Sequence, residues 1–333
     1  MLKHVIIGNG PAGIEAARTI RTIHEDDEIV VLSDEAHISY SRFLLPDYIA
    51  GRIPLERLWL QSESYYREAK IELRLRTKVA SVHSAGNSVT TADGERMEFD
   101  QLLIACGGKP KLPDINGIAE SGALTLKTLA DAQNILSRVK ARASVLVLGR
   151  DLIGVEMARA FCQMGTRVTY IAWENELLPN IIDPATAEEL SDKMRAAGVK
   201  MVLGEEILRM KSTNGTVSVD VAGKTLSADV LVVAVGMEPS LDSLNDSGIM
   251  VGSGVTTDER LRTNKANIYA AGDVAEIYDP RVHKRKLLFG WKNANEQGRI
   301  AGANMCGEDR EFEIKYAPGV KQIFGVDVRH RWK

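Results

Sequence analysis

The sequence predicts an α/β fold, because two of its segments begin in the same way. Each starts with an apolar strand, passes through a tight glycine turn into a helix pattern, and continues into a second apolar strand. The first segment starts at Lys3, and its helix is expected to end near His24; the second starts at Ala143, and its helix is expected to end near Met164. Two long segments of one design indicate a duplicated domain rather than a solenoid.

The remaining elements follow the two turns. The further elements that we expect are strands at 28–32, 101–108, 167–172, 229–236 and 267–273 and a helix at 291–305. Each strand is a short apolar run, and the helix shows the apolar spacing of a helical face. Glycine and proline after the strands at 101–108 and 229–236 mark places where the chain crosses between domains.

Composition narrows the class of protein. The chain has 333 residues, which is about two domains at roughly 150 residues each. Its 42 basic and 45 acidic side chains give a net charge of −3, which argues against a nucleic-acid binder. No apolar run approaches the roughly 18 residues of a membrane span, and the N-terminus enters a strand without a secretory signal. We therefore expect a cytoplasmic protein.

The three cysteines, Cys106, Cys162 and Cys306, lie far apart in the sequence. An odd, dispersed set is neither a disulfide framework nor a metal-ligand cluster. We therefore expect no disulfide and no metal site.

The turn at residues 8–13 fits the fingerprint of a dinucleotide-binding site. Gly8 permits the turn, Gly10 lets the backbone reach a pyrophosphate, and Gly13 lets the helix pack on the strand. The helix that begins at Pro11 and Ala12 then attracts phosphates with its N-terminus. Asp34 and Glu35 follow the next strand, where a carboxylate can bind the hydroxyl groups of a ribose.

With these motifs in place, the chain resembles the flavin-dependent pyridine nucleotide–disulfide oxidoreductases, flavoproteins with two dinucleotide-binding domains. The resembling segments are the turn at 8–13, Ile104–Gly108, the turn near Gly149, Thr263 with Ala271–Asp273, and Trp291–Gly298. Tyr40–Arg42, Leu44–Leu45 and Ala50–Gly51 are most similar to nitrite reductase flavoprotein domains and rubredoxin reductases.

The resemblance implies two Rossmann-like domains of the three-layer ββα type, with the NAD-type domain inserted in the FAD-type domain. The expected boundaries are 1–112 and 240–312 for the two parts of the FAD-binding domain, 113–239 for the NAD(P)-binding-like domain, and 313–333 for a remnant of a C-terminal interface domain. Family members continue into a longer interface domain, so we expect the end of this chain to be open to a docking partner.

The resemblance also assigns residues to FAD. They are Gly8, Gly10, Pro11, Ala12, Gly13, Asp34, Glu35, Arg42, Val79, Cys106, Gly107, Gly272, Asp273 and Trp291. Arg42 would meet the phosphates or the adenosine, Val79 would line the adenine, and Asp273 would contact the ribityl–pyrophosphate part. The simpler alternatives are a surface cation for Arg42, a core aromatic for Trp291 and plain packing for Cys106.

One departure from the family concerns its redox cysteine. In the segment Ile38–Phe43, the position of that cysteine is occupied by Phe43, and no cysteine precedes Cys106. Phenylalanine forms neither a thiolate nor a sulfenate, so thiol chemistry of that kind is excluded here.

A second departure lies in the turn that would bind NAD. The residues that we assign to NAD are Gly149, Gly154, Glu174 and Gly236, but Asp151 stands where the middle glycine is expected. Two like charges ~4 Å apart repel by about 4 kcal/mol at an effective dielectric of ~20. The site binds NAD if the carboxylate of Asp151 points away or Arg150 neutralises it; otherwise the domain is vestigial or binds an unusual ligand. No arginine cluster follows the strand at 167–172, which favours NAD over NADP.

A third departure concerns a lysine that relatives pair with a helix glutamate beside the flavin. The glutamate is Glu156, but the lysine position holds Asp47. Glu156 is our candidate catalytic residue, at the border of the nicotinamide pocket; the alternative is a structural role.

We therefore expect an FAD-dependent NAD(P)H oxidoreductase that passes hydride from NADH to FAD and electrons to an external acceptor, a redox protein or a metal or Fe–S subunit. The alternative is an FAD-containing electron relay or scaffold subunit of a larger complex, with a degenerate NAD site. Whether the chain forms oligomers or joins a complex is open.

Overall fold

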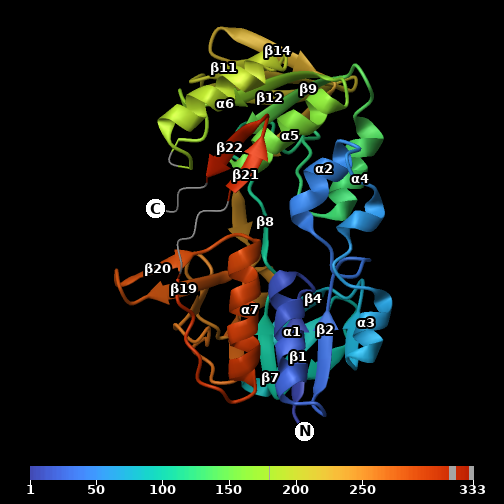
Figure 1. Ribbon diagram of the computed structural model, residues 1–333, viewed down its shortest axis with the longest axis vertical. Coiled ribbons are helices and arrows are strands. Elements are labelled where there is room, and N and C mark those ends of the chain that lie inside the picture. Colours follow the sequence, from blue (N-terminus) through green and yellow to red (C-terminus); the bar gives the residue numbers. More distant parts are fainter. Residues whose placement is uncertain (180, 315–319, 330–333) are drawn as a thin grey trace. The chain divides into compact units, whose positions relative to one another are not determined.

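The computed structural model describes residues 1–179, 181–314 and 320–329, and it divides into two units (Figure 1). Unit 1 comprises residues 1–41, 59–109 and 238–315; unit 2 comprises 42–58, 110–237 and 316–333. Residues 42–58, which the predicted boundaries assign to the FAD-binding domain, group with unit 2. No helix among the described residues is long and apolar enough to cross a bilayer.

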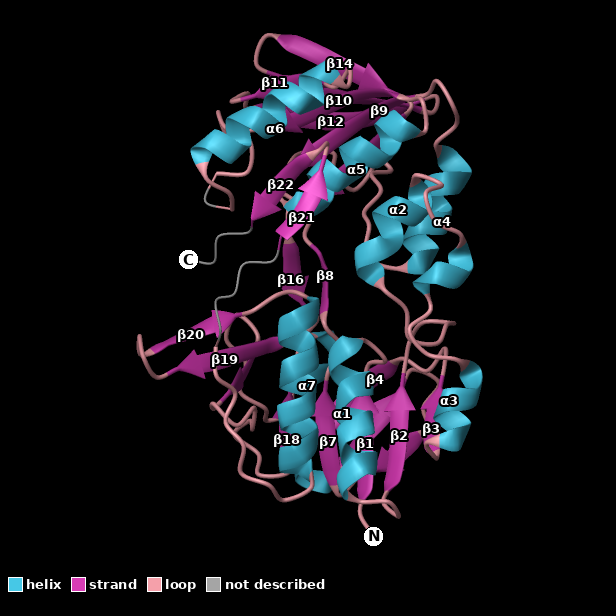
Figure 2. Cartoon of the chain, in the orientation of Figure 1, coloured by secondary structure: helices cyan, strands magenta, loops and turns pink. Residues whose placement is uncertain are grey.

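Unit 1 is built on a five-stranded parallel sheet with the strand order β18-β7-β1-β2-β3. These strands are β1 (Lys3–Ile7), β2 (Glu28–Leu32), β3 (Ile71–Arg74), β7 (Gln101–Ile104) and β18 (Ile268–Ala270). All but β3 are almost wholly buried, as expected for parallel strands that are covered on both faces. The helices are α1 (Pro11–Ile23), α3 (Glu63–Glu68) and α7 (Trp291–Met305), and Figure 2 shows α1 and α7 side by side along the sheet.

Two small sheets complete unit 1. One is antiparallel, β4 (Val79–His83), β5 (Ser88–Thr91) and β6 (Arg96–Glu98), and the other holds β17 (Val255–Thr257), β19 (Ala275–Asp279) and β20 (Lys284–Leu287). Val82, Val89 and Met97 from the antiparallel sheet share one core with the parallel sheet and the helices. Helices, parallel sheet and antiparallel sheet therefore form three layers, in agreement with the predicted fold class.

Unit 2 repeats this design around the four-stranded parallel sheet β11-β10-β9-β15. Its strands are β9 (Ser144–Gly149), β10 (Arg167–Ala172), β11 (Lys200–Leu203) and β15 (Val230–Ala234), and the antiparallel layer is β12 (Ile207–Thr213), β13 (Thr216–Val221) and β14 (Lys224–Ala228). The helices are α2 (Leu45–Ile49), α4 (Leu129–Arg138), α5 (Leu152–Gln163) and α6 (Pro184–Ala196). A hairpin of β21 (Val320–Ile323) and β22 (Val326–Arg329) packs against α5 and α6.

The two chain crossings expected near 107–113 and 236–239 are paired with each other. They form the short strands β8 (Gly108–Pro110) and β16 (Met237–Pro239). The second strands of the predicted repeat, at 28–32 and 167–172, have the expected bounds, and so does the separately predicted helix at 291–305.

Candidate functional site

The glycine turn of unit 1 is held by close backbone contacts. Gly8 has a φ of +113°, and a Cβ atom there would lie 2.2 Å from the carbonyl oxygen of Ala105 at the end of β7. A Cβ on Gly13 would lie 1.9 Å from the carbonyl oxygen of Gly8. No side chain fits at either position, so these glycines allow β1, α1 and β7 to converge.

Between these two glycines the turn is open. A Cβ on Gly10 would meet no atom within 4 Å, and Gly10 caps α1 without any side-chain hydrogen bond. Pro11 is the first helical residue, and the first turn of α1 carries no acidic side chain. The N–H groups at the start of α1 and the positive end of the helix dipole therefore face a space that a phosphate can enter.

The two acids after β2 lie in an ordered loop. Asp34 is exposed, and Glu35 is half-buried and accepts a hydrogen bond from the hydroxyl of Tyr40. The carbonyl oxygen of Glu35 accepts the N–H of Arg76 at 3.0 Å, and Ser33 accepts the N–H of Thr77 at 2.7 Å. These bonds fix the loop beside the segment that leads to Val79 in β4.

A second glycine turn follows β18 and lies against the start of α1. Gly272 has a φ of +81°, and a Cβ there would lie 3.2 Å from the Cβ of Ala12. The Asp273 carboxylate accepts the N–H of Gly290 at 3.1 Å, which ties this turn to the residue before Trp291, where α7 begins. The structure therefore gathers the predicted residues of the first turn, Gly272, Asp273 and the start of α7 in one region of unit 1.

Two buried amides next to these turns escaped the sequence analysis. Asn9 accepts a hydrogen bond from the hydroxyl of Tyr66 at 3.0 Å, and that hydroxyl accepts the N–H of Ser39 at 3.1 Å. Gln297 on α7 accepts the N–H of Gly272 at 2.6 Å. The Nδ2 atom of Asn9 and the Nε2 atom of Gln297 are buried and have no partner in the described part of the chain. Nothing in the sequence distinguishes Asn9, because it stands at a position where the fingerprint accepts any residue.

These features together fit a dinucleotide such as FAD. An open, uncapped helix N-terminus suits the diphosphate, the loop of Asp34 and Glu35 offers carboxylates to a ribose, and two buried amide donors lack acceptors. A buried donor without a partner costs free energy, so an acceptor on a bound ligand would satisfy it.

Cys106 and Gly107 are hydrogen-bonded to Ser240. Its thiol donates to the carbonyl oxygen of Ser240 at 3.2 Å, and the N–H of Ser240 donates to the carbonyl oxygen of Gly107 at 3.0 Å. Gly107 has a φ of +73°, a conformation that favours glycine. These contacts support the packing interpretation of Cys106.

The corresponding turn in unit 2 is also closely packed. A Cβ on Gly149 would lie 2.3 Å from the hydroxyl oxygen of Tyr170, and one on Gly154 would lie 2.9 Å from the Cα of Gly149. Tyr170 on β10 is fully buried, and its hydroxyl has no hydrogen-bond partner among the described residues. Gly236, after β15, has a φ of +114° and open space where its Cβ would be.

Asp151 caps the helix that starts at this turn. Its carboxylate accepts the N–H of Gly154 at 3.0 Å and is also hydrogen-bonded by the backbone of Ile153 and Gly236. Burial raises the pKa of Asp151 to about 6, although these three hydrogen bonds act in the opposite direction. The carboxylate thus occupies N–H groups that the turn of unit 1 leaves open.

Arg150 does not neutralise Asp151 but pairs with the predicted ribose acid. Its Nε lies 2.6 Å from Oε1 of Glu174, and its guanidinium lies 5.6 Å from the centre of the Trp173 ring. The charge of Glu174, the acid expected to bind a nucleotide ribose, is therefore partly balanced within the chain.

Glu156 is buried in α5 and forms an ion pair with Lys321 of β21. Burial raises the pKa of Glu156, and the charge of Lys321 opposes this shift. The Lys321 ammonium also lies 3.5 Å from the centre of the Phe43 ring, so it stacks on the residue at the position of the missing redox cysteine. Asp47, which stands at the family's lysine position, pairs instead with Arg159 at 2.6 Å.

The remaining candidate, Arg42, lies half-buried in a short 3-10 helix, Arg42–Leu44, that leads into α2. It belongs to unit 2, whereas the other residues assigned to FAD belong to unit 1.

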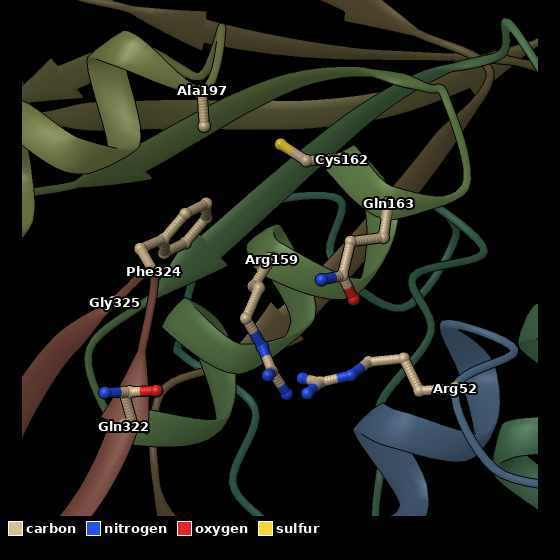
Figure 3. A pocket seen from close by; sticks show the side chains of 8 residues that line it. All are labelled: Arg52, Arg159, Cys162, Gln163, Ala197, Gln322, Phe324 and Gly325. Atoms are coloured by element: carbon tan, nitrogen blue, oxygen red, sulfur yellow. The ribbon is translucent and has the colours of Figure 1, made fainter.

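Unit 2 also contains a pocket of about 540 Å³ (Figure 3). It is lined by Arg52, Arg159, Cys162, Gln163, Ala197, Gln322, Phe324 and Gly325. Arg52 and Arg159 point toward one another, and Asp47 pairs with both. None of the predicted site residues lines this pocket, so it is separate from the predicted nucleotide turns.

Comparison with known proteins identifies relatives of the whole chain. Residues 2–298 match the family described as pyridine nucleotide-disulphide oxidoreductase. The chain is 30% identical over 332 residues to the epsilon subunit of NADH-dependent phenylglyoxylate dehydrogenase from Aromatoleum evansii, covering 97% of this chain and 75% of the relative. It is 31% identical to rubredoxin-NAD(+) reductase of Pseudomonas putida over 318 residues, 91% of this chain and 80% of the relative.

The fold agrees with solved structures. The putidaredoxin reductase chain in a covalent complex with putidaredoxin superposes with a TM-score of 0.87 at 25% identity, covering 96% of this chain and 78% of that one. The resemblance stated from the motifs is therefore confirmed, together with the α/β fold of two dinucleotide-binding units. The chain belongs to the pyridine nucleotide-disulphide oxidoreductase family, and it is an FAD-dependent NAD(P)H oxidoreductase.

Proposed function

We propose that this chain oxidises NADH at the turn of unit 2 and passes the electrons, through FAD held by unit 1, to an external acceptor. The acceptor that we propose is a small redox protein or a metal or Fe–S subunit. The observation that carries the proposal is the turn of unit 1, where α1 begins without a side-chain cap and with open space at Gly10.

In unit 1 the residues bind and orient the cofactor. The N–H groups at the start of α1 would hold the diphosphate, and Glu35 would accept hydrogen bonds from two ribose hydroxyl groups. Asp273 would contact the ribityl–pyrophosphate part of FAD. Bound FAD supplies hydride acceptance and the release of electrons singly or in pairs, while the protein supplies placement and electrostatics. As the family resemblance implies, Val79 would line the adenine, and Gly107 and Trp291 would also contact FAD.

In unit 2 the nucleotide would lie against Gly149, Gly154 and Gly236, with its ribose near Glu174. The carboxylate of Glu174 can accept hydrogen bonds from ribose hydroxyl groups, whereas it repels a 2′-phosphate. This supports NADH over NADPH as the substrate. Glu156 is our candidate beside the nicotinamide, and its ion pair with Lys321 keeps a negative charge in a buried position.

The proposal of an external acceptor is supported by the cysteines. In the described part of the chain none of the three cysteines forms a disulfide, and Phe43 stands where a redox cysteine is expected. Without a thiol to receive the electrons, they must leave for another molecule. Two relatives carry the names of reductases of redox proteins, rubredoxin and putidaredoxin, which makes a protein acceptor our choice. We propose a cytoplasmic location, where thiols stay reduced.

Steady-state kinetics test this function. The purified chain, loaded with FAD, is mixed with NADH and an artificial acceptor such as ferricyanide, and NADH oxidation is followed. We expect multiple turnovers with NADH and much slower ones with NADPH. A chain that retains stoichiometric FAD but turns over neither nucleotide contradicts the proposal.

One observation favours a second candidate function. Because Asp151 occupies the N–H groups of the α5 N-terminus, the NAD turn is partly filled by the chain itself. In that case the protein is an FAD-containing relay or scaffold subunit that receives its electrons from a partner. Recovery of the chain only within a stoichiometric complex, together with no turnover of NADH, would support this alternative.

A further inference from the structure

The pocket of unit 2 lies where four segments of that unit meet. Arg52 follows α2, and Arg159 lies on α5. Ala197 is the C-cap of α6, and Phe324 lies in the turn between β21 and β22. The volume of about 540 Å³ is in the range of pockets that bind small molecules. Neither the sequence analysis nor the proposed function assigns a ligand to this pocket.

Two arginines at one end of the pocket share a single carboxylate. Nη1 of Arg52 lies 3.2 Å from Oδ1 of Asp47, and Nη2 of Arg159 lies 2.6 Å from the same oxygen. Figure 3 shows the two guanidinium groups pointing toward one another. The ion pair of Lys321 and Glu156, close enough to interact with this group, is neutral as a whole. One positive charge therefore stays unbalanced at the arginine end.

The guanidinium of Arg159 is incompletely paired. Arg159 is only 7% exposed, and its Nη2 donates to Asp47. Its Nε atom has no hydrogen-bond partner among the described residues. A guanidinium carries five N–H donors, and a buried charge with too few partners is unfavourable. An anion in the pocket would supply acceptors and balance the excess charge.

The other end of the pocket is apolar. In Figure 3 the Phe324 ring, the sulfur of Cys162 and the methyl group of Ala197 lie away from the two guanidinium groups. Burial raises the pKa of the Cys162 thiol, so this side chain is neutral at neutral pH. Cys162 and Ala197 also lie at the C-terminal ends of α5 and α6, which carry a partial negative charge. The anionic group of a ligand is therefore favoured at the arginine end, and its apolar body at this end.

The backbone conformation of Phe324 is a second, independent sign of a ligand. Ile323 pairs with Val326, so Phe324 and Gly325 form a two-residue hairpin turn. Their φ angles are +51° and +83°. Positive φ at both central residues is typical of a type I′ turn, which favours Asn-Gly. A bulky aromatic residue with positive φ is an outlier, and such outliers gather at functional sites. The hairpin itself does not explain an aromatic ring at this place, whereas a ligand in the pocket does.

We propose that this pocket binds a small organic monocarboxylate with an aromatic body. The carboxylate would lie between Arg52 and Arg159, because planar guanidinium groups match its two oxygen atoms. The aromatic body would pack against the ring of Phe324. A single negative charge balances the single excess positive charge of the pocket. The site is independent of the proposed function, since none of these residues is assigned to FAD or NADH.

Isothermal titration calorimetry with 2-naphthoate tests this site. The FAD-loaded chain is titrated in a buffer that contains neither carboxylates nor phosphate, and we expect one site per chain. Two comparison compounds separate the parts of the ligand. 2-Naphthamide has the same rings without the charge, and acetate has the charge without the rings. Each should bind at least about tenfold more weakly than 2-naphthoate.

Two variants test the two ends of the pocket separately. Arg52 is exposed, so Arg52→Gln should keep the fold, weaken 2-naphthoate at least about tenfold and leave the affinity for 2-naphthamide unchanged. Phe324→Asn should keep or raise the melting temperature, because asparagine suits the turn, and should weaken 2-naphthoate about tenfold. Arg209→Gln removes an exposed arginine of β12 outside the pocket, and this control should bind 2-naphthoate like the parent chain.

Three results would overturn the proposal. They are the absence of 2-naphthoate binding at millimolar concentration, an equal affinity for 2-naphthamide, or an affinity for 2-naphthoate that either Arg52→Gln or Phe324→Asn leaves unchanged. The melting temperature and flavin content of each variant show that the fold persists, so a loss of binding is not mistaken for unfolding.

Discussion

At the scale of single residues, Gly10 in unit 1 and Asp151 in unit 2 occupy the same position of the two glycine turns but affect the helix that follows in different ways. Gly10 leaves the start of α1 open, whereas Asp151 places a carboxylate on the N–H groups at the start of α5. Both arrangements are sound helix starts, since glycine and aspartate are both accepted N-caps. The difference between them therefore concerns the ligand rather than the fold.

Gly10→Asp separates ligand binding from stability. The added carboxylate enters open space and can cap α1, so the melting temperature should stay equal or rise. The same charge repels a diphosphate, and FAD retained after purification should fall at least about tenfold. Gly10→Asn adds a side chain of the same size without its charge, so it is the control and should lose less FAD than Gly10→Asp. Full FAD occupancy in Gly10→Asp would show that the diphosphate lies elsewhere.

Asp151→Asn tests the self-capped turn through pH. Burial raises the pKa of Asp151 from 3.8 to about 6, so the folded chain holds a proton that the unfolded chain has lost between these values. Stability therefore falls as pH rises through this window, by about 3 kcal/mol in all. Asp151→Asn removes this fall, which urea unfolding at pH 4 and pH 7 measures.

Several other ionisable groups surround Asp151. The charge of Glu156 on α5 contributes to the raised pKa of Asp151. Tyr170 and Glu174 lie on the side of β10, and Arg150 forms an ion pair with Glu174.

Asp151→Gly removes the carboxylate from the turn and should tighten the binding of NADH, measured by calorimetry. Equal unfolding profiles of the parent and Asp151→Asn, together with equal affinity for NADH in Asp151→Gly, would contradict the role given to this carboxylate.

At the scale of elements, the close packing of α1 against α7 depends on glycine. Gly298 lies against the backbone of Ala12, close to the predicted FAD turn. Gly298→Ala forces the helices apart, which we expect to cost about 1–3 kcal/mol of unfolding free energy and to lower FAD content. Lys292→Ala, on the exposed face of α7, is the control. An unchanged midpoint of chemical unfolding would show that the two helices separate without cost.

The hairpin of β21 and β22 depends on one ion pair. Lys321 and Glu156 have side-chain exposures of 17% and 8%, so neither charge is well solvated. Lys321→Met leaves Glu156 buried without its cation and should destabilise unit 2 by about 3 kcal/mol. The double variant Lys321→Met with Glu156→Gln should recover part of this loss. If the single variant is as stable as the parent in thermal unfolding, the pair does not anchor the hairpin.

At the scale of the whole molecule, the fold was accessible from the sequence because its signals are local. Apolar runs such as 28–32 and glycine turns such as 8–13 lie within single segments, and the helix at 291–305 has its predicted bounds. The predicted domain boundaries and the roles of the site residues remain predictions.

Long-range pairs were not accessible in this way. The partner of Glu156 was sought at position 47, but the cation comes from Lys321 in a hairpin far along the chain, and Asp47 pairs with Arg159. Likewise, His4 on β1 and Cys306 at the end of α7 lie close together although they stand near opposite ends of the chain. Pairs of this kind follow from tertiary packing, which no single segment encodes.

An anaerobic reduction of the bound flavin tests the central claim, that NADH reduces FAD within this chain. The FAD-loaded protein is mixed with NADH, NADPH and then dithionite, and the loss of flavin absorbance is followed. We predict fast, stoichiometric bleaching by NADH and slow bleaching by NADPH. A flavin that dithionite bleaches but neither nucleotide does would contradict the account and would leave the relay as the function of this chain.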